Sequence, residues 1–264
     1  FCNGEIIPSN PALNTVVEFA HRVTSGIALP LVFWLVWQAF RLAPRGAAVR
    51  KAAAAAGVFI VLEAALGAGL VLFKYVAYNP SYARAVWMAG HLVNTLLLLG
   101  ALTLVAWWAS GGSVPRRLAP GRALAVGAAL VAVLVLAMGG AVTALGDTLV
   151  VGGGLDPTVH PVVATLVGLR LFHPAMAFVA LGVVAASVWQ SRGTAVVARG
   201  TTVLGLFVAQ MGLGALNVGL NVPVWMQIIH LLMTDVVWIA LVIWAAEALA
   251  AGPARSTQAL RAAV

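Results

Sequence analysis

Seven stretches of apolar residues, separated by short polar connections, make up most of the chain. They lie at about 14–40, 52–75, 85–109, 121–146, 168–190, 197–219 and 223–249. A helix needs about 20 mostly apolar residues to cross a bilayer, and each stretch reaches that length. The pattern therefore predicts an all-α membrane protein with seven transmembrane helices.

The composition agrees with this class of protein. Of the 264 residues, 62% are hydrophobic and only 8% are charged, whereas soluble domains carry about 25% charged residues. The net charge of +8 would indicate nucleic-acid binding only if the basic residues clustered on one face, and here they lie in short connections. The single cysteine, Cys2, cannot form a disulfide within the chain or a cysteine-rich metal site.

The basic residues fall mainly on alternate connections. Cytoplasmic loops of membrane proteins carry such an excess of Lys and Arg. We therefore predict a multi-pass protein of a prokaryotic plasma membrane, with a cytoplasmic C-terminus and its first residues outside. Eleven of the fifteen Lys and Arg residues lie in these connections and their flanks, namely Arg41, Arg45, Arg50, Lys51, Arg116, Arg117, Arg122, Arg192, Arg199, Arg255 and Arg261.

Three segments of the first part of the chain have counterparts in the second. HRVTSGIALPLVFWLVWQAFR (21–41) is similar to HPAMAFVALGVVAASVWQSR (173–192), with seventeen residues from His to Gln in both. Two shorter pairs follow, LEAALGAGLVL (62–72) with AQMGLGALNVGL (209–220), and VWMAGHL (86–92) with VWMQIIHL (224–231). The helix at 121–146 has no counterpart.

We therefore expect a parent of eight helices in two similar four-helix bundles, with seven helices here and the first upstream of residue 1. The N-terminal half is residues 1–109, the C-terminal half is residues 121–249, and residues 250–264 form a cytoplasmic tail.

Four of the five histidines follow the repeat. His21, His91, His173 and His230 all lie towards the outer ends of helices that run from outside to inside. A lone membrane histidine is more simply a hydrogen-bonded packing residue, but ionisable groups inside membranes are functional by default. Two imidazoles from facing helices can supply both axial ligands of a haem, so the two pairs predict two haem sites. Zinc would require further ligands that the sequence does not place nearby. The fifth, His160, lies in an outer loop without a counterpart.

Each half also has an arginine close to its first histidine, Arg22 in one and Arg170 in the other. Guanidinium groups suit the carboxylates of haem propionates, although arginines at helix ends also snorkel to the membrane surface. Glu18 lies three residues before His21, whereas the second half has Arg170 at that offset and repeats no carboxylate there. A carboxylate at only one haem indicates chemistry at that site and electron transfer at the other.

Three further polar residues lie within the apolar stretches. Glu63 and Gln210 are equivalent in the repeat and suit hydrogen bonds between helices, and a proton path through Glu63 stays open. Asp235 suits orientation of a ligand or capping of a neighbouring helix. The small-residue runs GAGL (67–70) and GLGAL (212–216) favour close approach of helices.

The motifs together resemble the haem A synthase family. CNGEIIPSNPALNTVVEFAHRVTSG (2–26) resembles its first outer loop and second helix, where a cysteine-containing loop leads into a Glu-x-x-His-Arg motif. GALNVGLNVPVWMQIIHLLMTDVVWIALVI (214–243) resembles its last two helices. GGAVTALGDTL (139–149) and LRLFHP (169–174) resemble its fifth helix and the start of its sixth. The resemblance covers essentially the whole chain.

This resemblance implies an oxidoreductase that converts a methyl group of haem O to a formyl group, giving haem A for terminal oxidases. It implies that His173 and His230 are axial ligands of a haem b cofactor, and that His21 and His91 face the iron of the substrate haem. Glu18 matches the motif's essential carboxylate. Haem O synthase and an electron donor are the implied partners.

The resemblance also implies that Cys2 forms a disulfide with a cysteine upstream of residue 1. The chain departs from some members in one respect, because the loop GDTLVVGGGLDPTVHP (146–161) lacks their second cysteine pair.

Two other functions stay open. A non-catalytic di-haem b-type cytochrome would transfer electrons only, and the unequal placement of Glu18 argues against it. A haem transporter or assembly protein is the second, since repeats are frequent in transporters. Transporters usually bind substrate at broken helices near the midplane, whereas the histidines here lie towards one end.

Overall fold

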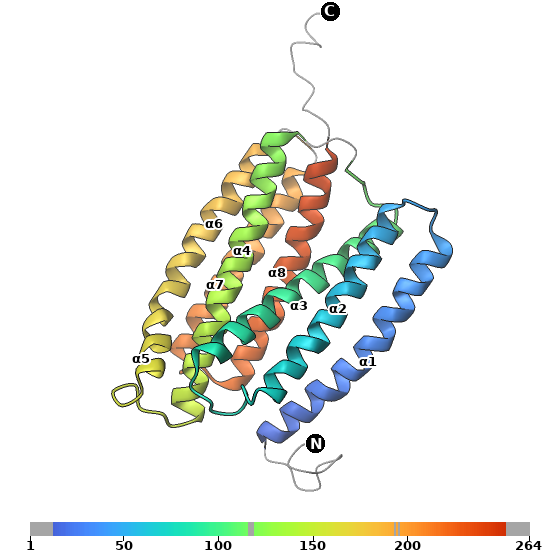
Figure 1. Ribbon diagram of the computed structural model, residues 1–264. Helices are drawn as coiled ribbons and strands as arrows, with labels where there is room; N and C mark the ends of the chain where they lie inside the picture. The colour runs from blue at the N-terminus through green and yellow to red at the C-terminus, as the bar shows by residue number, and fades with distance from the viewer. Residues whose placement is uncertain (1–12, 116–118, 193, 195, 252–264) are drawn as a thin grey trace, which may run out of the picture.

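The computed structural model describes residues 13–115, 119–192, 194 and 196–251. Within these ranges the chain is all-α, as the apolar pattern predicts (Figure 1). The α-helices are α1 (Leu13–Leu42), α2 (Ala48–Leu72), α3 (Tyr82–Ala109), α4 (Pro120–Asp147), α5 (Pro161–Gly168), α6 (Phe172–Gln190), α7 (Val197–Gly219) and α8 (Val224–Ala250). A π-helical turn, η1 (Thr148–Gly152), extends α4, and a 3-10 turn, η2 (Leu169–Leu171), joins α5 to α6.

Seven segments of the described chain are long and apolar enough to cross a membrane. This confirms the predicted all-α class and the seven helices. It also supports a multi-pass location in a membrane. The side of the membrane on which each end lies stays a prediction. Cys2 and the tail beyond residue 251 lie outside the described residues.

The fifth membrane segment differs from its predicted bounds of 168–190. It begins at Pro161, because α5, η2 and α6 follow one another as a single span of 30 residues. Proline fits the first helical position, where no backbone N–H is needed. The eight residues of α5 are too few to predict a span alone. The predicted start of this span at about residue 168 was therefore wrong, since residues 161–168 are helical.

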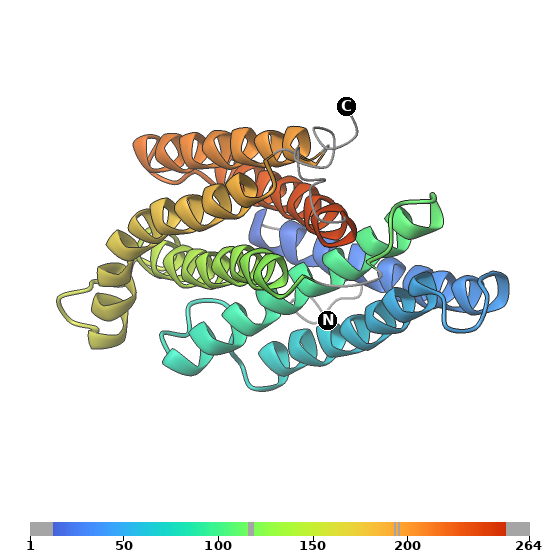
Figure 2. The same cartoon turned by 90° about the horizontal axis from the view of Figure 1, so that it is seen from above.

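The C-terminal helices form a closed ring in the order α4, α6, α7 and α8, and α8 contacts α4 again. Consequently α6 and α8 occupy opposite corners. In the N-terminal half α2 lies between α1 and α3, and α3 packs against both α4 and α8. Figures 1 and 2 show α3 crossing obliquely between the two groups of helices. The origin of the halves as repeats stays a prediction.

The buried core joins the two groups. The indole Nε1 of Trp238 on α8 donates a hydrogen bond to the backbone oxygen of Leu96 on α3, at 2.6 Å. Gly100 leaves room for this ring, because a Cβ atom there would lie 3.3 Å from the indole nitrogen. Trp244, which is fully buried, belongs to the same hydrophobic cluster. The Trp238 side chain thus connects the two halves within the core.

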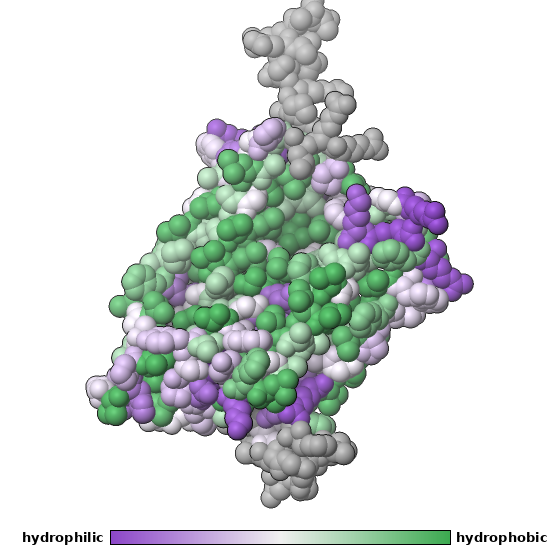
Figure 3. Space-filling model, viewed as in Figure 1, coloured by the Kyte–Doolittle hydropathy of each residue, from purple (hydrophilic) through white to green (hydrophobic). Residues whose placement is uncertain are grey.

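The surface has an apolar belt between two more hydrophilic ends (Figure 3). Large apolar side chains on this belt are exposed, as expected where lipid rather than water is the solvent. At the end formed by the last turns of α1 and α6, arginines lie over aromatic rings, Arg41 over Trp37 at 5.2 Å and Arg192 over Trp189 at 3.4 Å. Such pairs anchor helix ends at a membrane surface.

Candidate functional site

The four repeat-matched histidines lie on helices that begin at the same end of the molecule. In Figure 1 the helices α1, α3, α6 and α8 all start at the end nearest the N-terminus. Each of the four histidines, His21, His91, His173 and His230, lies within the first ten residues of its helix. His160, which precedes α5, lies at this end too. The alternation of the helices therefore gathers the imidazoles at one level.

In the C-terminal half, two imidazoles on opposite corners of the ring each lie against a glycine. A Cβ atom at Gly140 on α4 would lie 3.1 Å from Cε1 of His173, and one at Gly214 on α7 would lie 3.1 Å from Cε1 of His230. In both rings Nδ1 is buried without a hydrogen-bond partner. Both rings thus retain donor or acceptor capacity that the described residues do not use.

Gln210 connects α7 to the histidine-bearing turn of α8. Its Nε2 donates to the backbone oxygen of His230 at 2.9 Å and to Oγ1 of Thr234 at 2.6 Å. The same nitrogen lies 3.3 Å from Nε2 of His230. Oγ1 of Thr234 donates in turn to the backbone oxygen of His230 at 3.0 Å. The expectation of a hydrogen bond between helices at Gln210 is confirmed.

The N-terminal half repeats this arrangement with a carboxylate in place of the amide. Oε1 of Glu63 on α2 lies 3.4 Å from Nδ1 of His91 on α3. Glu63 accepts hydrogen bonds from Nδ2 of Asn94, at 2.6 Å, and from Oγ1 of Thr95. A Cβ atom at Gly67 would lie 3.7 Å from Cε1 of His91. The interhelical role expected for Glu63 is therefore confirmed as well.

The two sets of residues have the same spacing along the sequence. Each polar anchor precedes the glycine by four residues on one helix, and each histidine precedes a threonine by four on the next. Residues four apart share a helix face. The first set is Glu63, Gly67, His91 and Thr95, and the second is Gln210, Gly214, His230 and Thr234.

The residues of the Glu-x-x-His-Arg motif lie on the surface of α1. Nη2 of Arg22 donates to Oε1 of Glu18 at 2.8 Å, and the two side chains are 38% and 54% exposed. His21 is also exposed. Among the described residues, no hydrogen bond or ion pair joins His21 to His91. The structure therefore places these residues at the same end without bringing them into contact.

Arg170 on η2 forms an ion pair with Asp147, the last residue of α4. Asp147 is buried, and it lies seven residues after Gly140 on the same face of α4. The second half repeats no carboxylate at the offset of Glu18, as the sequence shows, but Asp147 of α4 supplies a carboxylate beside Arg170. Sequence reasoning missed Asp147 because the carboxylate comes from a different helix. The one indication was an acidic residue at the end of a long apolar stretch.

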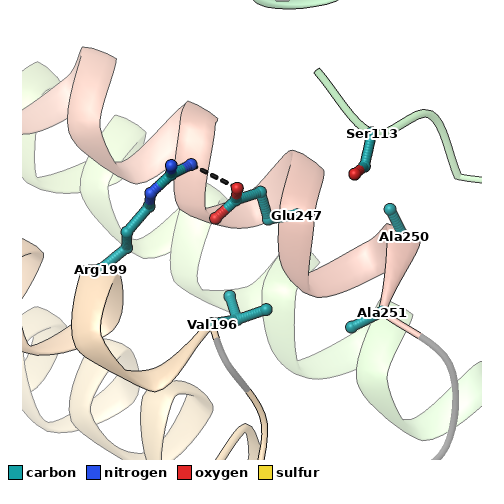
Figure 4. A pocket seen from close by; sticks show the side chains of 6 residues that line it. All are labelled: Ser113, Val196, Arg199, Glu247, Ala250 and Ala251. Carbon is teal, nitrogen blue, oxygen red and sulfur yellow. Dashed lines mark ion pairs between the residues drawn. The ribbon is translucent and has the colours of Figure 1, made fainter. Parts of the chain in front are cut away.

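A hollow at the opposite end of the molecule holds none of the histidines. Figure 4 shows its lining, in which Arg199 on α7 pairs with Glu247 on α8 beside Ser113 and Val196. The guanidinium of Arg199 also lies 4.9 Å from the ring centre of Trp107. This network joins α3, α7 and α8 at the basic end.

Within the described ranges, no three His, Cys, Asp or Glu side chains gather in a way that could hold a metal ion. Axial ligation of a haem needs only two imidazoles. The haem assignments of His173, His230, His21 and His91 therefore stay predictions, as do the propionate contacts of Arg22 and Arg170.

Fold and site together define a polytopic membrane protein with imidazoles set against glycines inside its helical bundle. Residues 9–242 match the model of the COX15-CtaA family, described as cytochrome oxidase assembly protein. The chain belongs to this family.

Several characterised relatives are similar to the chain. A protein of Thermus thermophilus named "Protoheme IX farnesyltransferase" is 44% identical over 268 residues, which is 96% of this chain and 43% of that protein. "Heme A synthase" of Halalkalibacterium halodurans is 39% identical over 72 residues, covering 27% of this chain and 24% of that enzyme. "Heme A synthase" of Alkalihalophilus pseudofirmus is 35% identical over 72 residues, with the same shares. The chain thus spans under half the length of the Thermus protein.

Proposed function

We propose that the chain acts in haem A synthesis by oxidising a methyl group of haem O to a formyl group. The conversion removes two hydrogen atoms and adds one oxygen atom, so four electrons pass from the substrate to an external oxidant of the dioxygen class, which also supplies the oxygen atom. The observation that carries the proposal is the repeated anchor–glycine–histidine–threonine arrangement, because it provides one inward imidazole in each half. Membership of the cytochrome oxidase assembly family and the similarity to haem A synthases support it.

The C-terminal half fits a haem b. His173 and His230 approach from opposite corners of one four-helix ring, and glycines leave room beside both rings. Their buried Nδ1 atoms have no hydrogen-bond partner, and Nε2 of His230 lies 3.3 Å from the amide nitrogen of Gln210. A haem bound between two such imidazoles supplies one-electron transfer. In this proposal His173 and His230 hold the cofactor, and Arg170, which pairs with Asp147, contacts a propionate.

The N-terminal half would receive the substrate haem. His91 is half-buried and stands against Gly67, while Glu18 and His21 on α1 are exposed. In this proposal His21 and His91 face the substrate iron, Arg22 contacts a propionate, and Glu18 orients or deprotonates the reacting group. The exposed Glu18–Arg22 pair is worth about 0–1 kcal/mol, so either residue can exchange its partner for substrate at little cost. Haem O synthase and an electron donor are the proposed partners.

The name of the Thermus relative describes prenyl transfer, a different reaction. Because the chain matches 43% of that protein, its name does not decide which part acts as a transferase. The seven acidic residues of this chain are dispersed along it, which offers little to a magnesium-bound diphosphate. We assign oxidation rather than prenyl transfer to the present chain.

The test measures conversion of haem O to haem A by the membrane-embedded chain supplied with dioxygen as the oxidant and with a reductant for the bound haem b. Glu18→Gln keeps size and hydrogen bonding but removes the basic group, so conversion should fall by about 10²–10⁴-fold while bound haem b stays normal. His173→Ala and His230→Ala should each abolish the low-spin haem b spectrum. Farnesylation of protohaem without oxidation of haem O would assign the transferase reaction instead. Normal conversion by Glu18→Gln would remove the catalytic role of that residue.

A further inference from the structure

The two polar anchors differ in charge and in the ring nitrogen that each approaches. Oε1 of Glu63 lies 3.4 Å from Nδ1 of His91, whereas Nε2 of Gln210 lies 3.3 Å from Nε2 of His230. Glu63 and Gln210 each lie one turn before a glycine that faces an imidazole, and each hydrogen-bonds to the threonine one turn after that histidine. Glutamate and glutamine have nearly the same size. The N-terminal half therefore has a carboxylate beside Nδ1 of its histidine, and the C-terminal half has an amide beside Nε2 of its histidine.

The carboxylate of Glu63 is held in place from α3. Nδ2 of Asn94 donates to Oε2 at 2.6 Å and also to the backbone oxygen of Phe59 at 2.9 Å. Thr95 donates to Oε1. Asn94 is buried, and the Glu63 side chain is only 18% exposed. In the part of the chain that the structure describes, no lysine or arginine pairs with Glu63, so His91 is its single ionisable partner.

His91 has a ring nitrogen that can donate to this carboxylate. Its Nδ1 is buried without a hydrogen-bond partner, and Oε1 of Glu63 is 3.4 Å away. A shift of a few tenths of an ångström would bring the two atoms to ordinary hydrogen-bond distance. A hydrogen bond from Nδ1 leaves Nε2 as the ring nitrogen available to a metal. A carboxylate acceptor also increases the electron density that the imidazole gives to its metal.

We propose that Glu63 is a positioning residue that accepts the Nδ1 hydrogen of His91, presents Nε2 to a haem iron and lowers the reduction potential there relative to the His230 site. This inference rests on the proposed function, which places a haem at each of these histidines. The carboxylate charge favours ferric over ferrous iron, whereas the neutral amide of Gln210 does not. The two haem sites of the molecule thus differ in the charge of the anchor beside each histidine and in the ring nitrogen that it approaches.

The experiment measures haem midpoint potentials by spectroelectrochemistry in the purified full chain loaded with ferric protohaem. In a His173→Ala background only the N-terminal site keeps both of its histidines. In a His91→Ala background only the C-terminal site keeps both of its histidines. Glu63→Gln is examined in the first background and Gln210→Glu in the second. Glu247→Gln, which removes a carboxylate at the opposite end of the molecule, is the matched control.

Glu63→Gln should raise the potential of the N-terminal site so that the ferric-to-ferrous ratio at a fixed ambient potential falls at least tenfold, equivalent to about 59 mV for a one-electron couple. Gln210→Glu should lower the potential of the C-terminal site, because it places a negative charge beside His230. Glu247→Gln should leave both potentials unchanged. If Glu63→Gln no longer retains haem, Glu63→Asp is measured instead; its shorter side chain draws the carboxylate away from Nδ1 of His91 and should also raise the potential, and an unchanged potential there would overturn the role of Glu63.

Unchanged potentials in both exchange variants with normal haem content would overturn the role of Glu63 and leave the haem assignments standing. Absence of haem from the His173→Ala background would overturn the proposed N-terminal site, and the inference with it. The two failures are therefore distinguishable by haem content.

Discussion

Replacing Gly214 with alanine tests the close packing of an imidazole against α7. The added methyl group would lie 3.1 Å from Cε1 of His230, which requires the ring to move by a few tenths of an ångström. Overpacking of this kind costs about 1–3 kcal/mol, while the higher helix propensity of alanine returns about 1 kcal/mol. The expected net loss of stability is therefore about 0–2 kcal/mol.

The matched control is Gly212→Ala, on the same helix one half-turn earlier. A Cβ atom at Gly212 meets nothing within 4 Å, so this variant gains helix propensity without a clash. Thermal unfolding in detergent, followed by circular dichroism, compares the two. Their free energies should differ by about 1–3 kcal/mol, and each kcal/mol corresponds to roughly 2–4 °C in a chain of this size.

The comparison has a second readout in the bound haem. Because His230 is a proposed ligand, Gly214→Ala should also reduce haem b content, and Gly212→Ala should not. Equal melting temperatures for the two variants would refute the close packing of His230 on α7. Unequal melting temperatures with equal haem content would confirm the packing but separate it from ligand placement.

Two further substitutions address the contacts between helices. Asp147→Asn leaves Arg170 without its ionic partner. Because the Asp147 side chain is 9% exposed but that of Arg170 is 40% exposed, we expect the free energy of unfolding to fall by about 1–3 kcal/mol, less than the 3–5 kcal/mol of a fully buried pair. An unchanged free energy of unfolding would show that solvent screens this pair. Trp238→Phe removes the hydrogen bond to Leu96 but keeps an aromatic ring, so denaturant unfolding should show a loss of about 0.5–1.5 kcal/mol. No loss at all would mean that this hydrogen bond does not hold the two halves together.

Much of the architecture follows from the sequence alone. The seven spans are readable because a bilayer requires long, nearly uninterrupted apolar stretches, and those are visible without any knowledge of packing. The sequence also predicts that the four histidines lie at the same end of the helical bundle. Antiparallel helices alternate in direction, so residues near the starts of α1, α3, α6 and α8 must gather at one end. The equivalence of Glu63 and Gln210 also followed from the repeat.

The partners in contacts between helices could not be predicted from the sequence, because the side chains that meet come from distant parts of the chain. Asp147 reaches Arg170 across 23 residues, and no local pattern pairs them. The glycine runs suggested close helix approach, but only the packing shows that Gly140 and Gly214 make room for imidazoles. The break at η2 was missed because α5 is too short to predict a span.

The sequence by itself therefore determined that this protein lies in a membrane, how many times it spans the bilayer and that its histidines share one end. Each of these depends on hydrophobicity and length along the chain. Only the tertiary structure decided which groups surround each imidazole. That choice depends on the corner of the bundle each helix occupies and on its rotation about its own axis. These are fixed by packing over the whole core, and they give His91 a carboxylate neighbour and His230 an amide.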